Sequence, residues 1–303
     1  MNILTTPLVS RPRRCSRALL LGFLFVSLVF QGQAVVLFPY NLTSSPNGGI
    51  DSSTAQVNLN PGNGYVPSWQ VDGVNMLSQQ LFYYSVGNNL AASIDTMPLT
   101  SSSTTLGGAV KGTYAASGVS ITPTFSLTSG VNSGGTYYTL GESILVKNTL
   151  STPQTINFFQ YSDFSLGIAS GSQTVNLSTI NPNLQYQATQ AGGGTYPSLQ
   201  DGYQIVALGP VTTTMQAGNS GLLFGPFIGN TPLDNATFSA SGTVVDYAFE
   251  SSATLGFNQS FTISEFQTIT VPEPSSVALI SLGMLALAVL NRRRWVMKLM
   301  PCR

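Results

Sequence analysis

Short segments in which apolar and polar residues alternate recur through the middle of the chain, and they constrain its fold more than any other feature. Two examples are NLQYQATQ at residues 183–190 and TVVDYAFE at residues 243–250. Successive side chains of a strand point to opposite sides, so the large apolar side chains of each segment share one face. The residues expected on these inner faces are Leu184, Tyr186, Ala188, Val245, Tyr247 and Phe249. The segments therefore predict half-buried β-strands.

Two further segments break the simple alternation. QTINFFQY, residues 154–161, has apolar residues on both faces, which predicts a strand that is covered on both sides. Its two apolar pairs are Ile156 with Phe158 and Phe159 with Tyr161. In SFTISEFQTITV, residues 260–271, Phe266 falls out of phase with the other apolar residues. That break predicts a bulge or a crossing between two sheets.

Glycine- and proline-rich stretches separate the strand-like segments. PNGG at residues 46–49 and NPGNG at residues 60–64 predict turns or loops. Pro123 lacks a backbone N–H, so it predicts an edge strand or two short strands around it. Residues 76–85, MLSQQLFYYS, predict an opening helical turn followed by a strand.

Many short strands with such turns, and no stripe of helical period, predict an all-β fold. The expected architecture is a large antiparallel β-sandwich over residues 35–270. All-β domains of this length are often single, so we favour one sandwich. Two smaller sandwiches, divided near Gly141 or near residues 192–194, are the alternative.

The distribution of charge and of reactive side chains excludes several classes of function. Between residues 35 and 272 the chain has two lysines against ten carboxyl groups, a net charge of −8, which argues against nucleic-acid binding. The chain has no histidine, and its two cysteines, Cys15 and Cys302, lie in the terminal segments. The middle of the chain therefore has no disulfide, no thiol nucleophile and no imidazole base.

The first 34 residues have the pattern of a secretory signal peptide. Four arginines between residues 11 and 17 precede the apolar run ALLLGFLFVSLVF at residues 18–30. GQA at residues 32–34 places small residues at the usual cleavage positions, so cleavage is expected after Ala34. Cys15 precedes the apolar run and cannot be the lipid-acceptor cysteine of a lipoprotein. The pattern predicts that residues 35 onward are exported.

The last 33 residues combine three features in a fixed order. Val-Pro-Glu-Pro at residues 271–274 is followed by a mostly apolar run at residues 275–290. That run measures about 24 Å as a helix, somewhat short of a ~30 Å hydrocarbon core, so it spans a membrane only with help from its flanks. Three basic residues that would stop translocation come next: Arg292, Arg293 and Arg294.

This order resembles the PEP-CTERM sorting signal of bacteria with an outer membrane. The resemblance implies that Pro272, Glu273 and Pro274 form the motif recognised by an exosortase, which removes the tail. It also implies an inner-membrane helix as a transient anchor. The chain continues past the basic cluster over residues 295–303, further than is usual in the family. Residues 71–88 and 158–167 are similar to segments of a recurrent PEP-CTERM ectodomain, for which the resemblance implies no established activity.

Catalytic and binding motifs are sparse in the middle of the chain. Asp163 lies among aromatic residues, where ending a strand is the favoured interpretation and catalysis with a second carboxylate is the alternative. Asp72-Gly73 and Asp201-Gly202 are typical turn dipeptides. No calcium-loop or nucleotide-binding motif is present, so the sequence predicts no cofactor and no metal site, although calcium held by distant loops stays open.

Aromatic residues offer one further possibility, a platform on which sugars stack. The candidates are Trp69, Tyr83, Tyr84, Tyr137 and Tyr138. Adjacent strand residues face opposite sides, so packing in the core and across strands is the favoured interpretation of these residues.

Together these patterns predict a non-enzymatic, exported cell-surface or matrix protein with a structural or adhesive role near exopolysaccharide. The expected partners are an exosortase, the inner membrane during sorting, and exopolysaccharide or other surface proteins, with no nucleic acid. A secreted carbohydrate-active enzyme that uses a carboxylate pair is the alternative function. A permanent membrane anchor, in which VPEP at residues 271–274 is only a linker, is the alternative for the tail.

Overall fold

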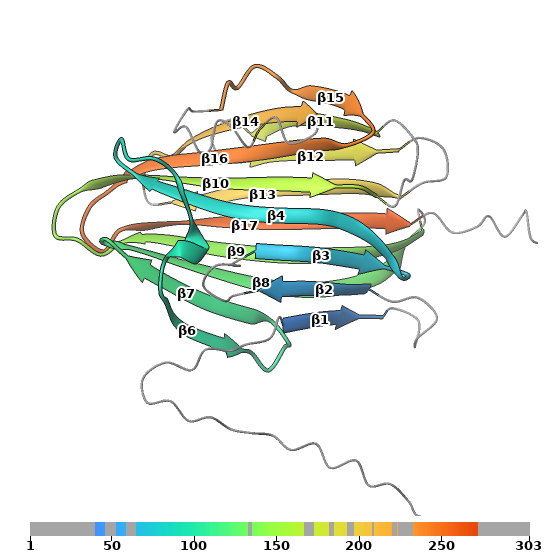
Figure 1. The fold of residues 1–303 in the computed structure, drawn as a ribbon, viewed down its shortest axis with the longest axis horizontal. Coiled ribbons are helices and arrows are strands. Elements are labelled where there is room, and N and C mark those ends of the chain that lie inside the picture. The colour runs from blue at the N-terminus through green and yellow to red at the C-terminus, as the bar shows by residue number, and fades with distance from the viewer. Residues whose placement is uncertain are drawn as a thin grey trace, which may run out of the picture. The chain divides into compact units, whose positions relative to one another are not determined.

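A computed structural model describes residues 40–45, 53–58, 65–132, 135–166, 173–181, 185–192, 197–207, 209–219, 223 and 233–271. These residues form an all-β fold of two antiparallel sheets packed as a sandwich (Figure 1). The prediction of an all-β sandwich is confirmed. The described strands form the two sheets of one sandwich, and the alternative of two smaller sandwiches was wrong.

Sheet A has the strand order β1-β2-β3-β4-β10-β16-β14, with the short β5 paired to β4. Its strands are β1 (Tyr40–Ser44), β2 (Ser53–Asn58), β3 (Tyr65–Val71), β4 (Val74–Val86), β5 (Ala92–Ser93), β10 (Gln154–Phe164), β14 (Thr212–Asn219) and β16 (Val245–Leu255). A 3-10 turn, η1 (Ile94–Thr96), follows β5.

Sheet B has the strand order β15-β11-β12-β13-β17-β9-β8-β7-β6. Its strands are β6 (Leu99–Thr104), β7 (Val110–Ala116), β8 (Val119–Asn132), β9 (Gly135–Asn148), β11 (Gln173–Asn181), β12 (Gln185–Ala191), β13 (Ser198–Ala207), β15 (Ser239–Gly242) and β17 (Ser260–Val271). The last strand in the sequence, β17, lies at the centre of this sheet between β13 and β9.

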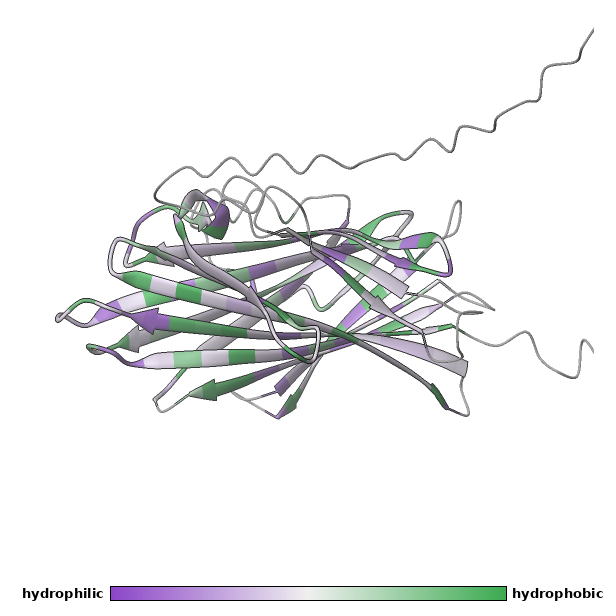
Figure 2. Cartoon of the chain, turned by 90° about the horizontal axis from the view of Figure 1, so that it is seen from below, coloured by the Kyte–Doolittle hydropathy of each residue, from purple (hydrophilic) through white to green (hydrophobic). Residues whose placement is uncertain are grey.

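Hydrophobic and hydrophilic residues alternate along many of the strands (Figure 2). The apolar side chains of the two sheets form one core between them. Ring contacts join the sheets directly: Phe82 of β4 lies 6.0 Å from Phe125 of β8, and Tyr203 of β13 lies 4.5 Å from Phe249 of β16, measured between ring centroids. Each fully buried large side chain contributes about 1.5–3 kcal/mol through its removal from water. Of the residues predicted to face inward, Tyr186, Ala188, Val245, Tyr247 and Phe249 are buried, and Leu184 lies outside the described residues.

The central strands of sheet A are covered on both faces, as the pattern of residues 154–161 predicted. Phe159 and Tyr161 point away from the main core and form a second apolar cluster on the outer face of sheet A. Leu223 and Leu233, from the connection between β14 and β15, pack on them. This outer cluster explains why β10 carries large apolar residues in both phases.

The irregular alternation of residues 260–271 has a different cause from the one predicted. β17 pairs with β13 and β9 without a register shift, so the prediction of a bulge or a crossing was wrong. Two polar residues, Glu265 and Gln267, occupy inward positions in phase with the buried apolar residues, while Phe266 faces outward and is 57% exposed. The break in hydrophobic phase marks polar groups inside the core.

Two other local predictions were wrong. Pro123 lies inside the continuous strand β8, between β9 and β7, and not on an edge strand. Proline has no N–H to donate to a neighbouring strand. The pairing of β8 with β7 is accordingly interrupted around Pro123, between the Lys111–Thr124 and Tyr114–Ile121 pairs. Residues 76–85 contain no helical turn, because all of them belong to β4.

The predicted signal peptide of residues 1–34, the sorting motif and the apolar run that follows it lie outside the described residues. So do the cleavage position Ala34 and the three arginines at 292–294. No helix within the described part of the chain is both long and apolar enough to cross a membrane. The predicted boundaries of the terminal segments stay predictions.

Candidate functional site

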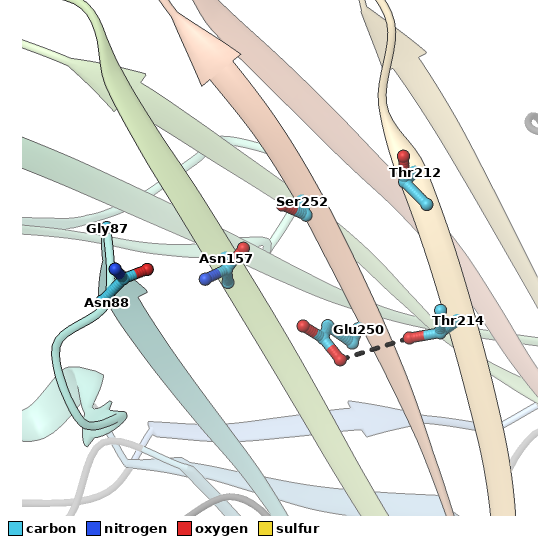
Figure 3. Close-up of a pocket in the computed structure, with 7 residues that line it drawn as sticks. All are labelled: Gly87, Asn88, Asn157, Thr212, Thr214, Glu250 and Ser252. Atoms are coloured by element: carbon cyan, nitrogen blue, oxygen red, sulfur yellow. Dashed lines mark hydrogen bonds between the residues drawn. The ribbon is translucent and has the colours of Figure 1, made fainter. Parts of the chain in front are cut away.

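The outer face of sheet A carries a polar groove, which we call the outer groove. Its volume is about 440 Å³, and it is lined by Gly87, Asn88, Asn157, Thr212, Thr214, Glu250 and Ser252. Figure 3 shows that hydroxyl and amide side chains surround the single carboxyl group of Glu250. The lining therefore offers hydrogen-bond donors and acceptors with little charge.

The strand register brings these side chains together from four distant parts of the sequence. Thr212 and Thr214 of β14 are the cross-strand neighbours of Ser252 and Glu250 of β16. Asn157 lies on the adjacent strand β10, and Gly87 and Asn88 follow directly after the end of β4. Cross-strand neighbours on adjacent strands point to the same side of a sheet. The polar residues that alternate with core residues on these strands therefore line the outer groove together.

Glu250 is buried at the base of the outer groove. Its Oε2 atom accepts hydrogen bonds from the Thr214 hydroxyl at 3.2 Å and from the Leu233 backbone N–H at 3.0 Å. Burial raises the pKa of Glu250, and the two hydrogen bonds oppose part of that rise. The carboxyl group is thus held in one orientation, with Oε1 available to a bound molecule.

The structure pairs Asp163, the acidic residue singled out from the sequence, with a second carboxyl group. Asp163 of β10 lies directly opposite Asp246 of β16, and Tyr161 donates a hydrogen bond of 3.1 Å to Asp246. Burial and the neighbouring Asp246 raise the pKa of Asp163 to about 6. β10 ends at Phe164, one residue after Asp163, and its pairing with β4 shifts register between these two residues.

A second group of polar residues lies between the sheets, inside the core. We call it the inner polar layer; its members are Gln80, Glu142, Gln160, Ser162, Asp201, Tyr247, Glu265 and Gln267. All are at most 3% exposed. Sheet A contributes Gln80, Gln160, Ser162 and Tyr247, and sheet B contributes the three acids and Gln267.

Hydrogen bonds connect much of this layer. Glu265 Oε1 accepts from the amides of Gln160, across the sheets, and of Gln267 at 2.8 Å. Asp201 Oδ2 accepts a hydrogen bond of 2.6 Å from the Tyr247 hydroxyl. The network therefore ties β13 and β17 of sheet B to β10 and β16 of sheet A.

Burial controls protonation in the inner polar layer. It raises the pKa of Glu142 and of Glu265 well above the usual range, and Asp201 adds to both rises. The pKa of Asp201 is also raised by burial, but hydrogen bonds from Glu265, Tyr247 and Gln267 oppose that rise. Asp201 is therefore the member best able to carry a negative charge.

Sequence reasoning missed the inner polar layer. Asp201 was expected in a turn, yet it lies within β13 with its side chain fully buried. The Asp72-Gly73 prediction is confirmed, since both residues have positive φ between β3 and β4. One sequence signal could have predicted the inner polar layer: in β17, Glu265 and Gln267 fall in phase with buried isoleucines.

The aromatic residues are used for packing, as the favoured interpretation had it. Trp69 is fully buried, donates a hydrogen bond of 2.7 Å to Ser53 and makes an edge contact with Phe164. Tyr138 is buried in the main core, and Tyr83 and Tyr84 pack on opposite faces of sheet A. No metal-binding group of three or more histidine, cysteine or acidic side chains occurs among the residues that the structure describes.

Several solved structures resemble the sandwich. A bacterial glucoamylase complexed with acarbose matches with a TM-score of 0.50 and 10% identity over 80% of this chain. A protein from Synechocystis sp. PCC 6803 matches with a TM-score of 0.40 and 8% identity, over 80% of this chain and all of that one. A family GH92 alpha-mannosidase from Bacteroides thetaiotaomicron matches with a TM-score of 0.37 and 11% identity, over 77% of this chain and 31% of that one.

The chain spans about a third of the glucoamylase, 34% of its length. At 10% identity this likeness concerns the fold alone. No curated protein matches the sequence significantly.

The match to the tail of the chain is more specific than these matches to solved structures. The family model described as the PEP-CTERM protein-sorting motif matches residues 270–294. The matched segment begins at Thr270, inside β17, and covers the proline-glutamate-proline motif, the apolar run and the three arginines. Such a motif implies export, sorting to the cell surface and processing by an exosortase. The chain is therefore a PEP-CTERM protein, an exosortase substrate.

Proposed function

We propose that this PEP-CTERM protein is a non-enzymatic surface or matrix protein that binds exopolysaccharide through the outer groove. The observation that carries the proposal is the lining of the groove, in which amides and hydroxyls surround one buried carboxyl group. Sugar hydroxyls both donate and accept hydrogen bonds, and such a lining complements them. The low charge of the chain, 7% of residues, fits a neutral ligand of this kind.

Removing two amides from the outer groove is expected to weaken polysaccharide binding. We expect the double substitution Asn88→Ala with Asn157→Ala to lower affinity roughly tenfold or more, because each lost hydrogen bond costs about 0.5–1.5 kcal/mol. The measurement is calorimetric titration with exopolysaccharide purified from the producing cells, after a glycan array has identified the bound sugars. A matched control is Gln200→Ala with Gln204→Ala, which removes two exposed amides from sheet B. Equal affinity of both double variants and the wild type would contradict the groove as the binding site.

The alternative function, a carbohydrate-active enzyme, is favoured by one observation. Asp163 and Asp246 are directly opposite on neighbouring strands, where Cβ atoms lie about 4.5–5.5 Å apart, so two carboxyl groups stand side by side as a retaining glycosidase requires. The mixtures of protein and polysaccharide from the titrations are therefore also assayed for reducing ends released by hydrolysis. Binding without release supports the proposed function. Release that is lost on Asp163→Asn would overturn it and support the enzyme.

We also propose that processing removes the tail and that the apolar run is a transient anchor. The prolines at 272 and 274 fix φ and disfavour helix just before them, which favours an extended segment open to a processing enzyme. An epitope tag placed after Arg303 is expected to be lost from the mature protein in cells with an exosortase and kept in cells without one. Immunoblotting of surface and inner-membrane fractions measures this. A tag retained in the inner membrane of exosortase-positive cells would support a permanent anchor.

A further inference from the structure

One oxygen of the Glu250 carboxyl group faces the outer groove without a hydrogen bond. Glu250 is 7% exposed, so nearly the whole residue is removed from water. Its Oε2 atom accepts hydrogen bonds from Thr214 and Leu233, whereas Oε1 accepts none from the described residues. Figure 3 shows Oε1 on the side of Asn157, across the groove from Thr214. A buried carboxyl group that is only half paired points to a bound partner for its second oxygen.

The described part of sheet A has no cationic side chain that could pair with Glu250. The described residues contain two lysines and no arginine, and both lysines, Lys111 of β7 and Lys147 of β9, belong to sheet B. The outer side of sheet A carries two further carboxyl groups instead, those of Asp163 and Asp246. Buried charges in proteins are normally paired. The outer groove therefore disfavours an acidic polysaccharide and leaves the positive partner of Glu250 to be supplied by the ligand.

The groups nearest to Glu250 in the outer groove are set up to accept hydrogen bonds. The Thr214 hydroxyl donates its one proton to Glu250 and can then only accept. Asn157 donates from Nδ2 to the Ser85 hydroxyl at 2.9 Å, which leaves its Oδ1 atom on the side of β16 (Figure 3). An ammonium group carries three N–H donors and no acceptor, so it complements such a set of acceptors better than a hydroxyl does.

We infer that the polysaccharide in the outer groove contains amino sugars with free amino groups, and that Glu250 binds their ammonium groups. This inference rests on the proposed function of the groove as a polysaccharide site. Glu250 Oε1 accepts a charge-assisted hydrogen bond from the ammonium group, and Asn157 Oδ1 accepts a second one. The other hydroxyls and amides of the lining bind hydroxyls of the neighbouring neutral sugars. The groove volume of about 440 Å³ lies within the usual range of small-molecule sites, about 300–1,000 Å³.

Chemical N-acetylation of the polysaccharide tests the inference without any change to the protein. Acetic anhydride in water converts free amines into neutral acetamides. We expect exopolysaccharide purified from the producing cells to bind the exported protein roughly tenfold or more tightly before acetylation than after it, because charge-assisted hydrogen bonds are about twice as strong as neutral ones. The measurement is calorimetric titration of the two forms in parallel at low salt, where ionic interactions are least screened.

Two variants assign the preference to one carboxyl group. Glu250→Gln keeps the shape of the side chain and an oxygen for the bonds from Thr214 and Leu233, and it is expected to bind both forms with the lower affinity. The matched control is Asp72→Asn, which removes one negative charge from the turn at the opposite end of β4 from the outer groove. Asparagine before Gly73 suits that turn, so Asp72→Asn should keep the full preference for the unacetylated form.

The possible results separate this inference from the proposed function. Equal wild-type affinity for the two forms would overturn the inference and leave the outer groove as a site for neutral sugars. If neither form binds, the proposed function fails and the inference fails with it. A penta-lysine peptide offers ammonium groups without sugar. Binding of that peptide that is lost in Glu250→Gln, together with no effect of acetylation, would assign the carboxyl group to a protein partner and overturn the inference.

Discussion

The protein is expected to unfold at a higher temperature near pH 4.5 than near pH 8, the reverse of ordinary acid denaturation. Burial raises the folded-state pKa of Glu142, Asp201 and Glu265 above the unfolded value. The folded protein then binds more protons than the unfolded chain between those two values, so stability falls as pH rises. The full contribution is present below the unfolded pKa, about 4, and is lost as pH rises through the folded pKa.

The carboxyls on the outer face act in the same direction. The pKa of Asp163 is raised to about 6, which adds about 1 kcal/mol after its partial exposure is discounted, and that of Glu250 is also raised. Asp234 opposes them, since hydrogen bonds from its own turn lower its pKa, but it is exposed. We expect a rise in Tm of roughly 5 °C or more from pH 8 to pH 4.5.

Differential scanning calorimetry across this pH range measures the effect. Glu265→Gln keeps the shape of the side chain but removes one titrating group, so it is expected to flatten the profile. The exposed amide of Gln200 provides a control, because Gln200→Ala removes no titrating group and should leave the slope unchanged. A Tm that falls steadily from pH 8 to pH 4.5 in the wild type would show that the inner carboxyls are ionised in the folded state.

Replacing Trp69 by alanine is expected to be the most destabilising single change in the apolar core. The indole is fully buried, contacts Phe164 and donates to Ser53, so its removal leaves a cavity and an unpaired hydroxyl. We expect a loss of about 3–5 kcal/mol, measured by urea denaturation. Trp69→Phe, which keeps most of the apolar volume, should lose less.

The same variant separates the two interpretations of the aromatic residues. If Trp69 only packs the core, the folded fraction of Trp69→Ala should bind polysaccharide with wild-type affinity. A loss of binding without a loss of stability would instead place this tryptophan on a sugar-stacking platform.

The sequence allowed the class of fold to be predicted because alternation is a local property of the chain. Tyr186 and Val245 could be placed inside from their neighbours alone. The same local reasoning assumed that inward positions are apolar, so it took the break near Phe266 for a distortion of the strand. Polar groups can be buried when they hydrogen-bond one another. In this protein the hydrogen-bond partners come from both sheets, so local sequence cannot reveal them.

The candidate sites could not be predicted for a related reason. Asp163 is paired with Asp246, and Asn157 and the threonines of β14 are brought to one surface because both of their strands pair with β16. Strand register depends on interactions across the whole sheet, so it cannot be predicted from a local sequence motif. The sorting signal was found from sequence because its three parts are consecutive.

The position of β17 has a consequence for the order in which the protein assembles during export. A chain that crosses the membrane from its N-terminus delivers β17 after all other strands of sheet B. Until then β13 and β9 present unpaired edges on both sides of an open slot, the kind of surface that recruits strands from other molecules. The residues matched to the sorting motif begin within β17, so if the tail anchors the chain as proposed, arrest at the membrane would coincide with delivery of the strand that closes the slot. Under that proposal, completion of the sheet and arrival at the processing enzyme would be one event, and the open slot would exist only while β17 is still being delivered.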